Sequence, residues 1–141
     1  FVIENIKSYQ LSYPVAIDVE TTVQHEMSKE ALTDLVIGFC EEIEKAGYRP
    51  MVYTSLSWFL EQLDMERLQS YEKWVAAWGD GHFENDGIYA MWQYSNKGKV
   101  AGITGNVDLN ICYKKFVEDK KEYETPQNKL PTCVKSTKKK I

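Results

Sequence analysis

Hydrophobic residues follow two different spacings along the first half of the chain. Residues 13–20 are rich in β-forming side chains and become polar only at their far end, so they predict a buried strand with a polar tip. Ser28 is then a plausible N-cap for a helix that Gly47 would end. The inward-facing residues of this helix are expected to be Leu32, Leu35, Val36, Phe39 and Ile43. Residues 49–55 predict a second strand, which completes a β-α-β unit with parallel strands.

The second half of the chain loses this alternation of strand and helix. A second helix is expected over about residues 57–69, and its inward-facing residues would be Phe59, Leu60, Leu63 and Leu68. Short strands are then expected at 73–78 and 88–94, with a hairpin turn at 95–98 and a last strand at 107–110. The order is β-α-β-α followed by three strands without a helix between them. An ordinary doubly wound sheet would have continued to alternate.

Composition is that of a globular chain with an unusual end. Of the 141 residues 43% are hydrophobic and 27% are charged, which is enough for one domain with a core, expected over residues 1–113. From Lys114 onward nine lysines face four acids, so residues 114–141 are expected to be a basic linker and tail. A basic tail on an acidic body is not the charge pattern of a nucleic-acid-binding face, so no nucleic-acid partner is expected.

No apolar run approaches the roughly 18 to 20 residues that a membrane span needs, so no membrane partner is expected. The three cysteines are widely spaced and only two histidines accompany them, which argues against a zinc site and against a disulfide scaffold. Cys40 lies on the apolar side of the first helix and is expected to be a buried thiol. The chain begins at Phe1 and not at Met, which suggests a processed product or a fragment without its export signal.

Two acids mark the end of the first strand. Because strand side chains alternate, Asp18 and Glu20 share a face with Ala16. The carboxyl ends of parallel strands are where α/β folds bind ligands. Two neighbouring carboxylates repel, so one keeps its proton more easily, which provides the acid and the charged partner that glycoside cleavage requires. Taken alone, an Asp-x-Glu tripeptide such as residues 18–20 is more often a solvated strand end or the cap of the next loop.

Aromatic residues are the second feature that points to a site. Tyr53 comes near the end of the second strand and Trp74 lies on the third, while Trp92 and Tyr94 share a face on the fourth. Sugar rings present apolar C–H faces and hydroxyl edges, so a cleft lined by aromatic residues with acids at its base suits a glycan. Each of these aromatic residues, considered singly, is more often part of the core.

A third acid follows a glycine and an asparagine near the end of the pattern. Alternation along residues 107–110 puts Asp108 and Asn110 on one face of the last strand and the apolar residues on the other. Asp108 is therefore a further candidate for the site, although it could also simply close a turn.

Five blocks of this sequence resemble family 25 glycoside hydrolases, the bacterial, phage and fungal lysozymes. The blocks are YPVAIDVE at 13–20, GYRPMVYTS at 47–55, WVA at 74–76, WQYS at 92–95 and GNVDLN at 105–110. The resemblance implies hydrolysis of the β-1,4 bond between N-acetylmuramic acid and N-acetylglucosamine in peptidoglycan, without a metal or other cofactor. It also implies that Glu20 is the proton donor, that Asp18 is the nucleophile or the stabiliser of an attacking acetamido group, and that Asp108 supports them.

The resemblance further implies a fold and its missing part. The family fold is an irregular, TIM-like (β/α)5β3 barrel, and the pattern here begins near its fourth strand. We therefore expect strands four to eight in this chain. The N-terminal strands, the first of which carries another active-site aspartate in the family, are not expected in it. The sheet edge at Val15–Val19 would then be bare and Ala16 and Met51 would be exposed, which predicts self-association. The expected site of action is extracellular or at the cell wall.

Two other interpretations remain open from the residues. The chain could be a non-catalytic remnant that binds cell-wall glycan through its aromatic cleft and basic tail. It could also be an unrelated α/β domain whose acids are only structural.

Overall fold

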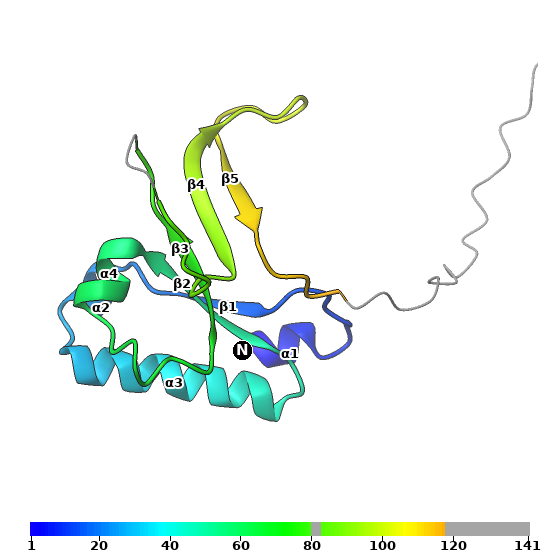
Figure 1. Cartoon of the computed structure of the whole chain (residues 1–141). Helices are drawn as coiled ribbons and strands as arrows, with labels where there is room; N and C mark the ends of the chain where they lie inside the picture. Colours follow the sequence, from blue (N-terminus) through cyan, green and yellow to red (C-terminus); the bar gives the residue numbers. More distant parts are fainter. Residues whose placement is uncertain (80–82, 118–141) are drawn as a thin grey trace, which may run out of the picture.

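A computed structural model describes residues 1–79 and 83–117 (Figure 1). The helices are α1 (Val2–Ile6), α2 (Thr22–His25), α3 (Lys29–Lys45) and α4 (Leu56–Glu61). The strands are β1 (Val15–Asp18), β2 (Pro50–Ser55), β3 (Glu72–Ala76), β4 (Met91–Gly98) and β5 (Val107–Cys112). The expected basic tail lies outside the described residues except for its first four positions. Within the described ranges, none of the helices has the length and apolar character that crossing a membrane requires.

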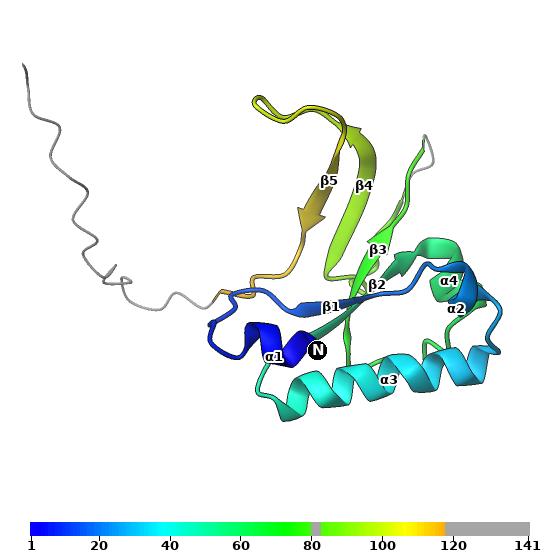
Figure 2. The same ribbon diagram turned by 180° about the vertical axis from the view of Figure 1, so that it is seen from behind.

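The five strands form one curled sheet in the order β1-β2-β3-β4-β5. The first four strands are parallel and β5 returns antiparallel to β4. Figures 1 and 2 show β4 and β5 standing away from the helices, while α3 runs along the other side of the sheet. The predicted mixed α/β order, in which no helix lies between the last three strands, is therefore confirmed, although α1 before β1 and the short α2 were not predicted. The curled sheet has the form of half a barrel.

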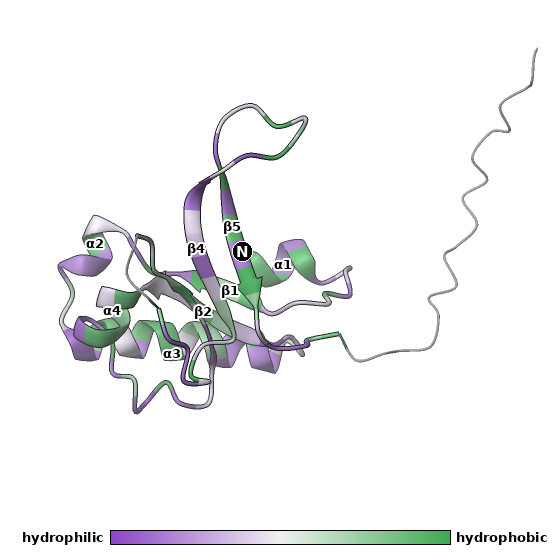
Figure 3. Ribbon diagram, turned by 45° about the horizontal axis from the view of Figure 1, so that its top comes forward, coloured by the Kyte–Doolittle hydropathy of each residue, from purple (hydrophilic) through white to green (hydrophobic). Residues whose placement is uncertain are grey.

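The helix α3 begins and ends where the sequence predicts. The Ser28 hydroxyl accepts a hydrogen bond from the backbone N–H of Ala31, and Gly47 takes the left-handed φ of +85° that ends the helix. Polar and apolar residues alternate around it in Figure 3. Leu32 and Cys40 are fully buried, as expected, but Leu35 is 42% exposed, so its predicted inward position is wrong. The helix turns Leu35 just past the edge of the apolar stripe.

The second helix is shorter than predicted, because α4 ends at Glu61 and not near residue 69. An Asp64 carboxylate oxygen accepts hydrogen bonds from the backbone N–H groups of Glu66 and Arg67, which gives this segment a local alternative to helix. Of the apolar residues expected to face inward, Leu60 is 64% exposed. The others, Phe59, Leu63 and Leu68, are buried.

The predicted hairpin turn at residues 95–98 is also wrong, because β4 continues through Gly98. A Cβ atom at Gly98 would lie 2.5 Å from the Leu109 side chain of the paired strand. This glycine therefore serves close packing within the hairpin and not the turn. The chain reverses after it, where the Lys99 ammonium donates to the Gly105 carbonyl and to the Asn106 side chain.

The two faces of the sheet are covered differently. The face toward α3 holds the main core, which includes Val19, Val52 and Val75. The opposite face, called the open face below, carries a small second cluster in which Phe116 packs on Met51 and Ala90.

Phe116 corrects one expectation about the chain. Met51 is 1% exposed because Phe116 covers it, so the predicted exposure of Met51 is wrong, whereas Ala16 is exposed as expected. Residues that follow position 113 also contact the body of the fold. The Arg49 guanidinium donates to the Phe116 carbonyl at 2.9 Å, and Lys114 forms an ion pair with Glu72. A single phenylalanine among lysines gave no sequence pattern that would predict this contact.

We expect Phe116→Ala to destabilise the protein by about 3 kcal/mol, because it removes a buried aromatic ring and uncovers Met51. Urea unfolding followed by circular dichroism measures this change. Val117→Ala is the matched control, since Val117 is 44% exposed and should change the free energy of unfolding by less than about 0.5 kcal/mol. Equal effects of the two substitutions would mean that Phe116 does not close the open face.

Candidate active site

Val19 fixes the direction of the two acids at the end of β1. Its side chain is fully buried in the main core. Its backbone N–H donates to the Tyr53 carbonyl at 3.0 Å, and its carbonyl accepts from the Thr54 hydroxyl. Because neighbouring side chains in an extended chain point to opposite sides, Asp18 and Glu20 are turned away from the core and are exposed.

The short helix α2 holds the backbone beneath these acids. Thr21 and Gln24 form a capping box, in which the Thr21 hydroxyl accepts from the Gln24 N–H. The oxygen of the Gln24 side-chain amide also accepts a hydrogen bond from the backbone N–H of Glu20 at 3.0 Å. Its amide nitrogen donates to the Asp18 carbonyl at 3.3 Å. Gln24 was not among the predicted site residues, although the T-x-x-Q spacing is a recognisable signal for such a cap.

Tyr53 and Trp74 lie beside Asp18 on the open face. The strand register pairs Asp18 with Tyr53, and Tyr53 with Trp74, so the three residues form one row across β1, β2 and β3. The two rings meet edge to face with centroids 4.8 Å apart. The Trp74 indole N–H donates to the Asn110 side chain at 2.9 Å, which ties the row to β5.

Gln93 connects the strands at the centre of this face. Its side chain is 2% exposed, and its carbonyl oxygen accepts from the Tyr53 hydroxyl at 3.2 Å and from the Trp78 indole N–H at 2.9 Å. An indole nitrogen can only donate, so the orientation of the amide is fixed by Trp78. Gln93 was missed in the sequence, where a glutamine between two aromatic residues of a strand was the available signal.

Trp92 and Tyr94 do not join Tyr53 and Trp74. Trp92 lies on the opposite face of β4, where it packs against the main core and its indole N–H donates to the Ala77 carbonyl at 2.9 Å. Tyr94 packs on Trp92, with ring centroids 5.7 Å apart. The prediction that Trp92 and Tyr94 share one face of β4 is correct. Because side chains alternate along the strand, Gln93 between them then lies on the other face, which is the face of the acids.

The negative charges of two carboxylates act on Glu20. Burial raises the pKa of Glu20, and the negative charges of Asp18 and Asp108 raise it further. Burial also raises the pKa of Asp18. The pKa of the Tyr53 phenol is raised by burial and then by Glu20, Asp18 and Asp108. The structure therefore brings Asp108 of β5 into the electrostatic neighbourhood of Glu20.

Within residues 1–79 and 83–117 no three His, Cys, Asp or Glu side chains are arranged to hold a metal ion. Cys40 is buried, as predicted, and burial raises the pKa of its thiol to about 12. The Cys112 thiol donates to the Lys114 carbonyl at 3.0 Å. Cys133 lies outside the described residues. What the site offers chemically is two carboxyl groups, Asp18 and Glu20, whose raised pKa favours the protonated form, beside aromatic rings.

The sequence matches the family described as "Glycosyl hydrolases family 25" over residues 1–103, which is well over half of the chain. The protein YegX of Escherichia coli (strain K12) is 29% identical over 111 residues, which cover 77% of this chain and 40% of YegX. An autolytic lysozyme of Clostridium acetobutylicum is 29% identical over 105 residues, which cover 74% of this chain and 32% of the lysozyme.

The solved structures include a similar fold. The crystal structure of the CTP1L endolysin superposes with a TM-score of 0.67 at 26% identity, over 82% of this chain and 40% of the endolysin. The chain thus spans well under half of the length of the relatives that it matches.

We expect Asp18→Asn to lower the pKa of Glu20, because removing a neighbouring negative charge makes ionisation of Glu20 easier. Asp108→Asn should lower it by a smaller amount, since Asp108 contributes less to the shift. Carbon-13 NMR titration of the Glu20 side-chain carboxyl measures both effects. Glu41→Gln on the exposed surface of α3 is the control and should leave this pKa unchanged. If Asp108→Asn leaves the pKa of Glu20 unchanged, Asp108 on β5 does not act electrostatically on Glu20.

Proposed function

The chain belongs to glycosyl hydrolases family 25, and from this membership we propose that Asp18, Glu20 and Asp108, called the acid cluster below, form part of a muramidase site. The bond cleaved is the β-1,4 link between N-acetylmuramic acid and N-acetylglucosamine in peptidoglycan. The observation that carries the proposal is the raised pKa of Glu20 next to two other carboxylates and an aromatic row. That is the arrangement in which one carboxyl keeps a proton to donate.

Glu20 is the general acid in this mechanism. Burial and the charges of Asp18 and Asp108 favour its protonated form, so it holds a proton to higher pH than an ordinary glutamate. That proton passes to the glycosidic oxygen as the bond to the leaving sugar breaks. Glu20 must be protonated to act as the acid, so activity is lost as the pH rises through its pKa. Because this pKa is raised, the loss occurs at a higher pH than for an ordinary glutamate.

Asp18 is the negative partner of this reaction. In its ionised form it either attacks the sugar carbon or stabilises a substrate acetamido group that attacks instead. Its capped backbone position, bonded through Gln24, limits its movement relative to Glu20. Asp108 supplies electrostatic support from β5 and helps to position the substrate.

The open face supplies the sugar-binding surface. Tyr53 and Trp74 present aromatic rings beside Asp18, and such rings pack against the C–H faces of sugars. Trp78 adds a ring that is 54% exposed and is held in place by Gln93. Trp92 and Tyr94, which were expected in this surface, support it only from behind, through the core and β4.

The same family membership supports a proposal about fold and place of action. We propose that β1 to β5 correspond to strands four to eight of a TIM-like (β/α)5β3 barrel. The substrate would be peptidoglycan glycan strands, and the protein would act outside the cell or at the cell wall. Neither a nucleic acid nor a membrane is part of this proposal.

The test of the proposed function is the release of reducing sugar ends from purified peptidoglycan by the 141-residue chain. Release that rises with time supports a muramidase, and mass spectrometry of the products identifies the cleaved bond by its reducing sugar. Binding to cell walls without any release would instead identify a non-catalytic glycan-binding protein. Absence of both binding and release would mean that the acids are structural.

In a protein that also carries the N-terminal strands of the family barrel, we expect Glu20→Gln to lower kcat by about 10² to 10⁴, since the substitution keeps the shape of the side chain and removes the acid. Asp18→Asn should be comparably damaging, because an amide neither attacks nor stabilises developing positive charge. Asp108→Asn should cost less. Steady-state assays with soluble glycan fragments measure these effects, and Glu26→Gln, exposed at the end of α2, is the control.

An activated substrate separates the roles of the two acids. When the leaving group needs little protonation, the Glu20→Gln variant should regain much of its lost rate and the Asp18→Asn variant little. Recovery in the opposite order would show that the two roles are reversed.

We also propose that the chain self-associates through β1, which has β2 as its only strand neighbour in the described sheet. Val15 and Val19 direct their N–H groups to β2, so Ala16 between them directs its N–H to the free edge. Sedimentation should give an average mass above the 16.4 kDa of one chain. Ala16→Pro removes only the outward donor and should restore the monomer. A wild-type chain that sediments as a uniform monomer would contradict this expectation.

A further inference from the structure

The Tyr53 hydroxyl has two kinds of acceptor in its neighbourhood and only one proton to donate. The first acceptor is the side-chain amide oxygen of Gln93, which receives the hydroxyl proton at 3.2 Å. The others are carboxylates, because the strand register pairs Tyr53 with Asp18 and the charges of the whole acid cluster act on the phenol. A phenolic hydroxyl donates a single hydrogen bond. The bond to Gln93 is therefore one that no carboxylate receives.

Glu20 is the acid whose charge acts most strongly on Tyr53. Burial raises the pKa of the Tyr53 phenol, and the hydrogen bond to Gln93 lowers it. The negative charges raise it again, with Glu20 ahead of Asp18 and Asp108. Since the interaction of two charges weakens with the distance between them, Glu20 is the first alternative acceptor for the hydroxyl proton.

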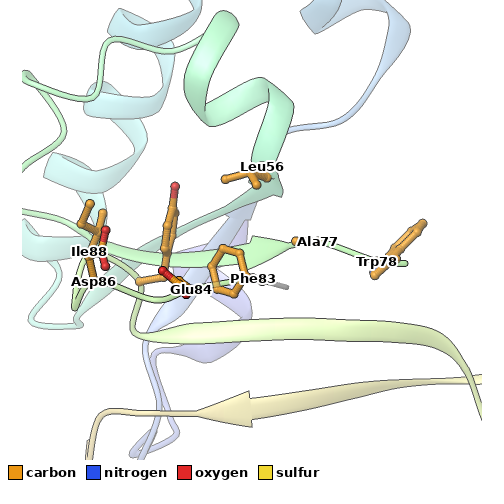
Figure 4. A pocket seen from close by; sticks show the side chains of 8 residues that line it. Leu56, Ala77, Trp78, Phe83, Glu84, Asp86 and Ile88 are labelled. Carbon is orange, nitrogen blue, oxygen red and sulfur yellow. The ribbon is translucent and has the colours of Figure 1, made fainter. Parts of the chain in front are cut away.

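The orientation of the Gln93 amide keeps its oxygen toward Tyr53. The side chain is 2% exposed, and the same oxygen accepts from the Trp78 indole N–H at 2.9 Å. An indole nitrogen only donates, so turning the amide over would set two donors against each other. Trp78 follows the end of β3, where it also lines a groove of about 400 Å³ (Figure 4). A residue outside β4 thus decides which end of the amide meets Tyr53.

We propose that Gln93 is a positioning residue that takes the hydroxyl proton of Tyr53 and so withholds it from the Glu20 carboxylate. The inference rests on the proposed function, because it concerns Glu20 as the proton donor. In this arrangement Tyr53 presents only oxygen lone pairs to the acid cluster. A lone pair accepts from a protonated carboxyl group and repels an ionised one, so the acid form of Glu20 is favoured.

Removing the Gln93 oxygen would reverse this effect. The freed hydroxyl would donate to the Glu20 carboxylate, and a hydrogen bond to the charged form of an acid lowers its pKa. Glu20 would then lose its proton at a lower pH. A smaller fraction of the protein would hold a proton to donate near neutral pH.

A double-mutant cycle with Gln93→Met and Tyr53→Phe tests this proposal on the 141-residue chain, with carbon-13 NMR titration of the Glu20 carboxyl as the readout. Methionine is unbranched like glutamine and offers only a weakly accepting sulfur. Gln93→Met should lower the pKa of Glu20 by roughly half a pKa unit, a modest effect because this carboxylate is exposed. Trp78 is 54% exposed, so water can accept from its indole N–H in this variant.

Tyr53→Phe is the matched control, since it removes the hydroxyl and keeps the ring. Because the proton already goes to Gln93, this substitution alone should not raise the pKa of Glu20. In the Tyr53→Phe background, Gln93→Met should leave that pKa unchanged. A merely structural role of Gln93 would alter the pKa in both backgrounds alike. Gln93→Leu provides the same comparison if Gln93→Met does not fold.

The outcomes are distinct from those of the proposed function. A rise in the pKa of Glu20 on Tyr53→Phe would show that the hydroxyl donates to Glu20 in the wild-type chain, which would overturn the inference. No effect of Gln93→Met, or an equal effect with and without the Tyr53 hydroxyl, would also overturn it. The titration needs no substrate. The expected cycle in a chain that neither binds nor cleaves peptidoglycan would therefore support the role of Gln93 and reject the proposed function.

Discussion

Burial of Val19 is the constraint on which the acid cluster depends. Its side chain packs in the main core, while both of its backbone polar groups are bonded to β2. A residue held in this way cannot rotate, so the side chains before and after it must point away from the core. Asp18 and Glu20 therefore meet on one side because of the apolar residue between them. The packing and hydrogen bonds of β1 offset the electrostatic repulsion between the two nearby carboxylates.

The sheet separates stability from chemistry by face. The face toward α3 is apolar and buried, whereas the open face carries a polar network in which Gln93 joins Tyr53 to Trp78 and Trp74 joins Asn110. Such a network orients its members more narrowly than apolar contacts would, because each hydrogen bond has a preferred direction. The aromatic side chains near the acids are thus held in place through hydrogen bonds of their polar atoms.

Two parts of the molecule are completed by segments that are distant in sequence. Phe116 closes one end of the open face over Met51 and is held there by Arg49. At the other end, the Trp78 indole N–H donates to Gln93, and Trp78 also lines a groove beside α4. The open face therefore has apolar packing at one end and the hydrogen bond between Trp78 and Gln93 at the other.

The sequence by itself determined the features that depend on near neighbours. The start of α3 at Ser28, its end at Gly47 and the shared direction of Asp18 and Glu20 follow from capping and from strand alternation, which act over a few residues. These rules also gave the order of strands and helices, and five short blocks were enough to indicate the family.

Only the tertiary structure decided which face of each strand meets the acids. Alternation places Trp92 and Gln93 on opposite faces of β4. It does not say which of them lies on the face of the acids, because that depends on where the main core lies. The role of Gly98 and the covering of Met51 by Phe116 likewise depend on contacts between residues far apart in the chain. Such contacts form because the sheet curls, and no local pattern of polar and apolar residues records the curvature.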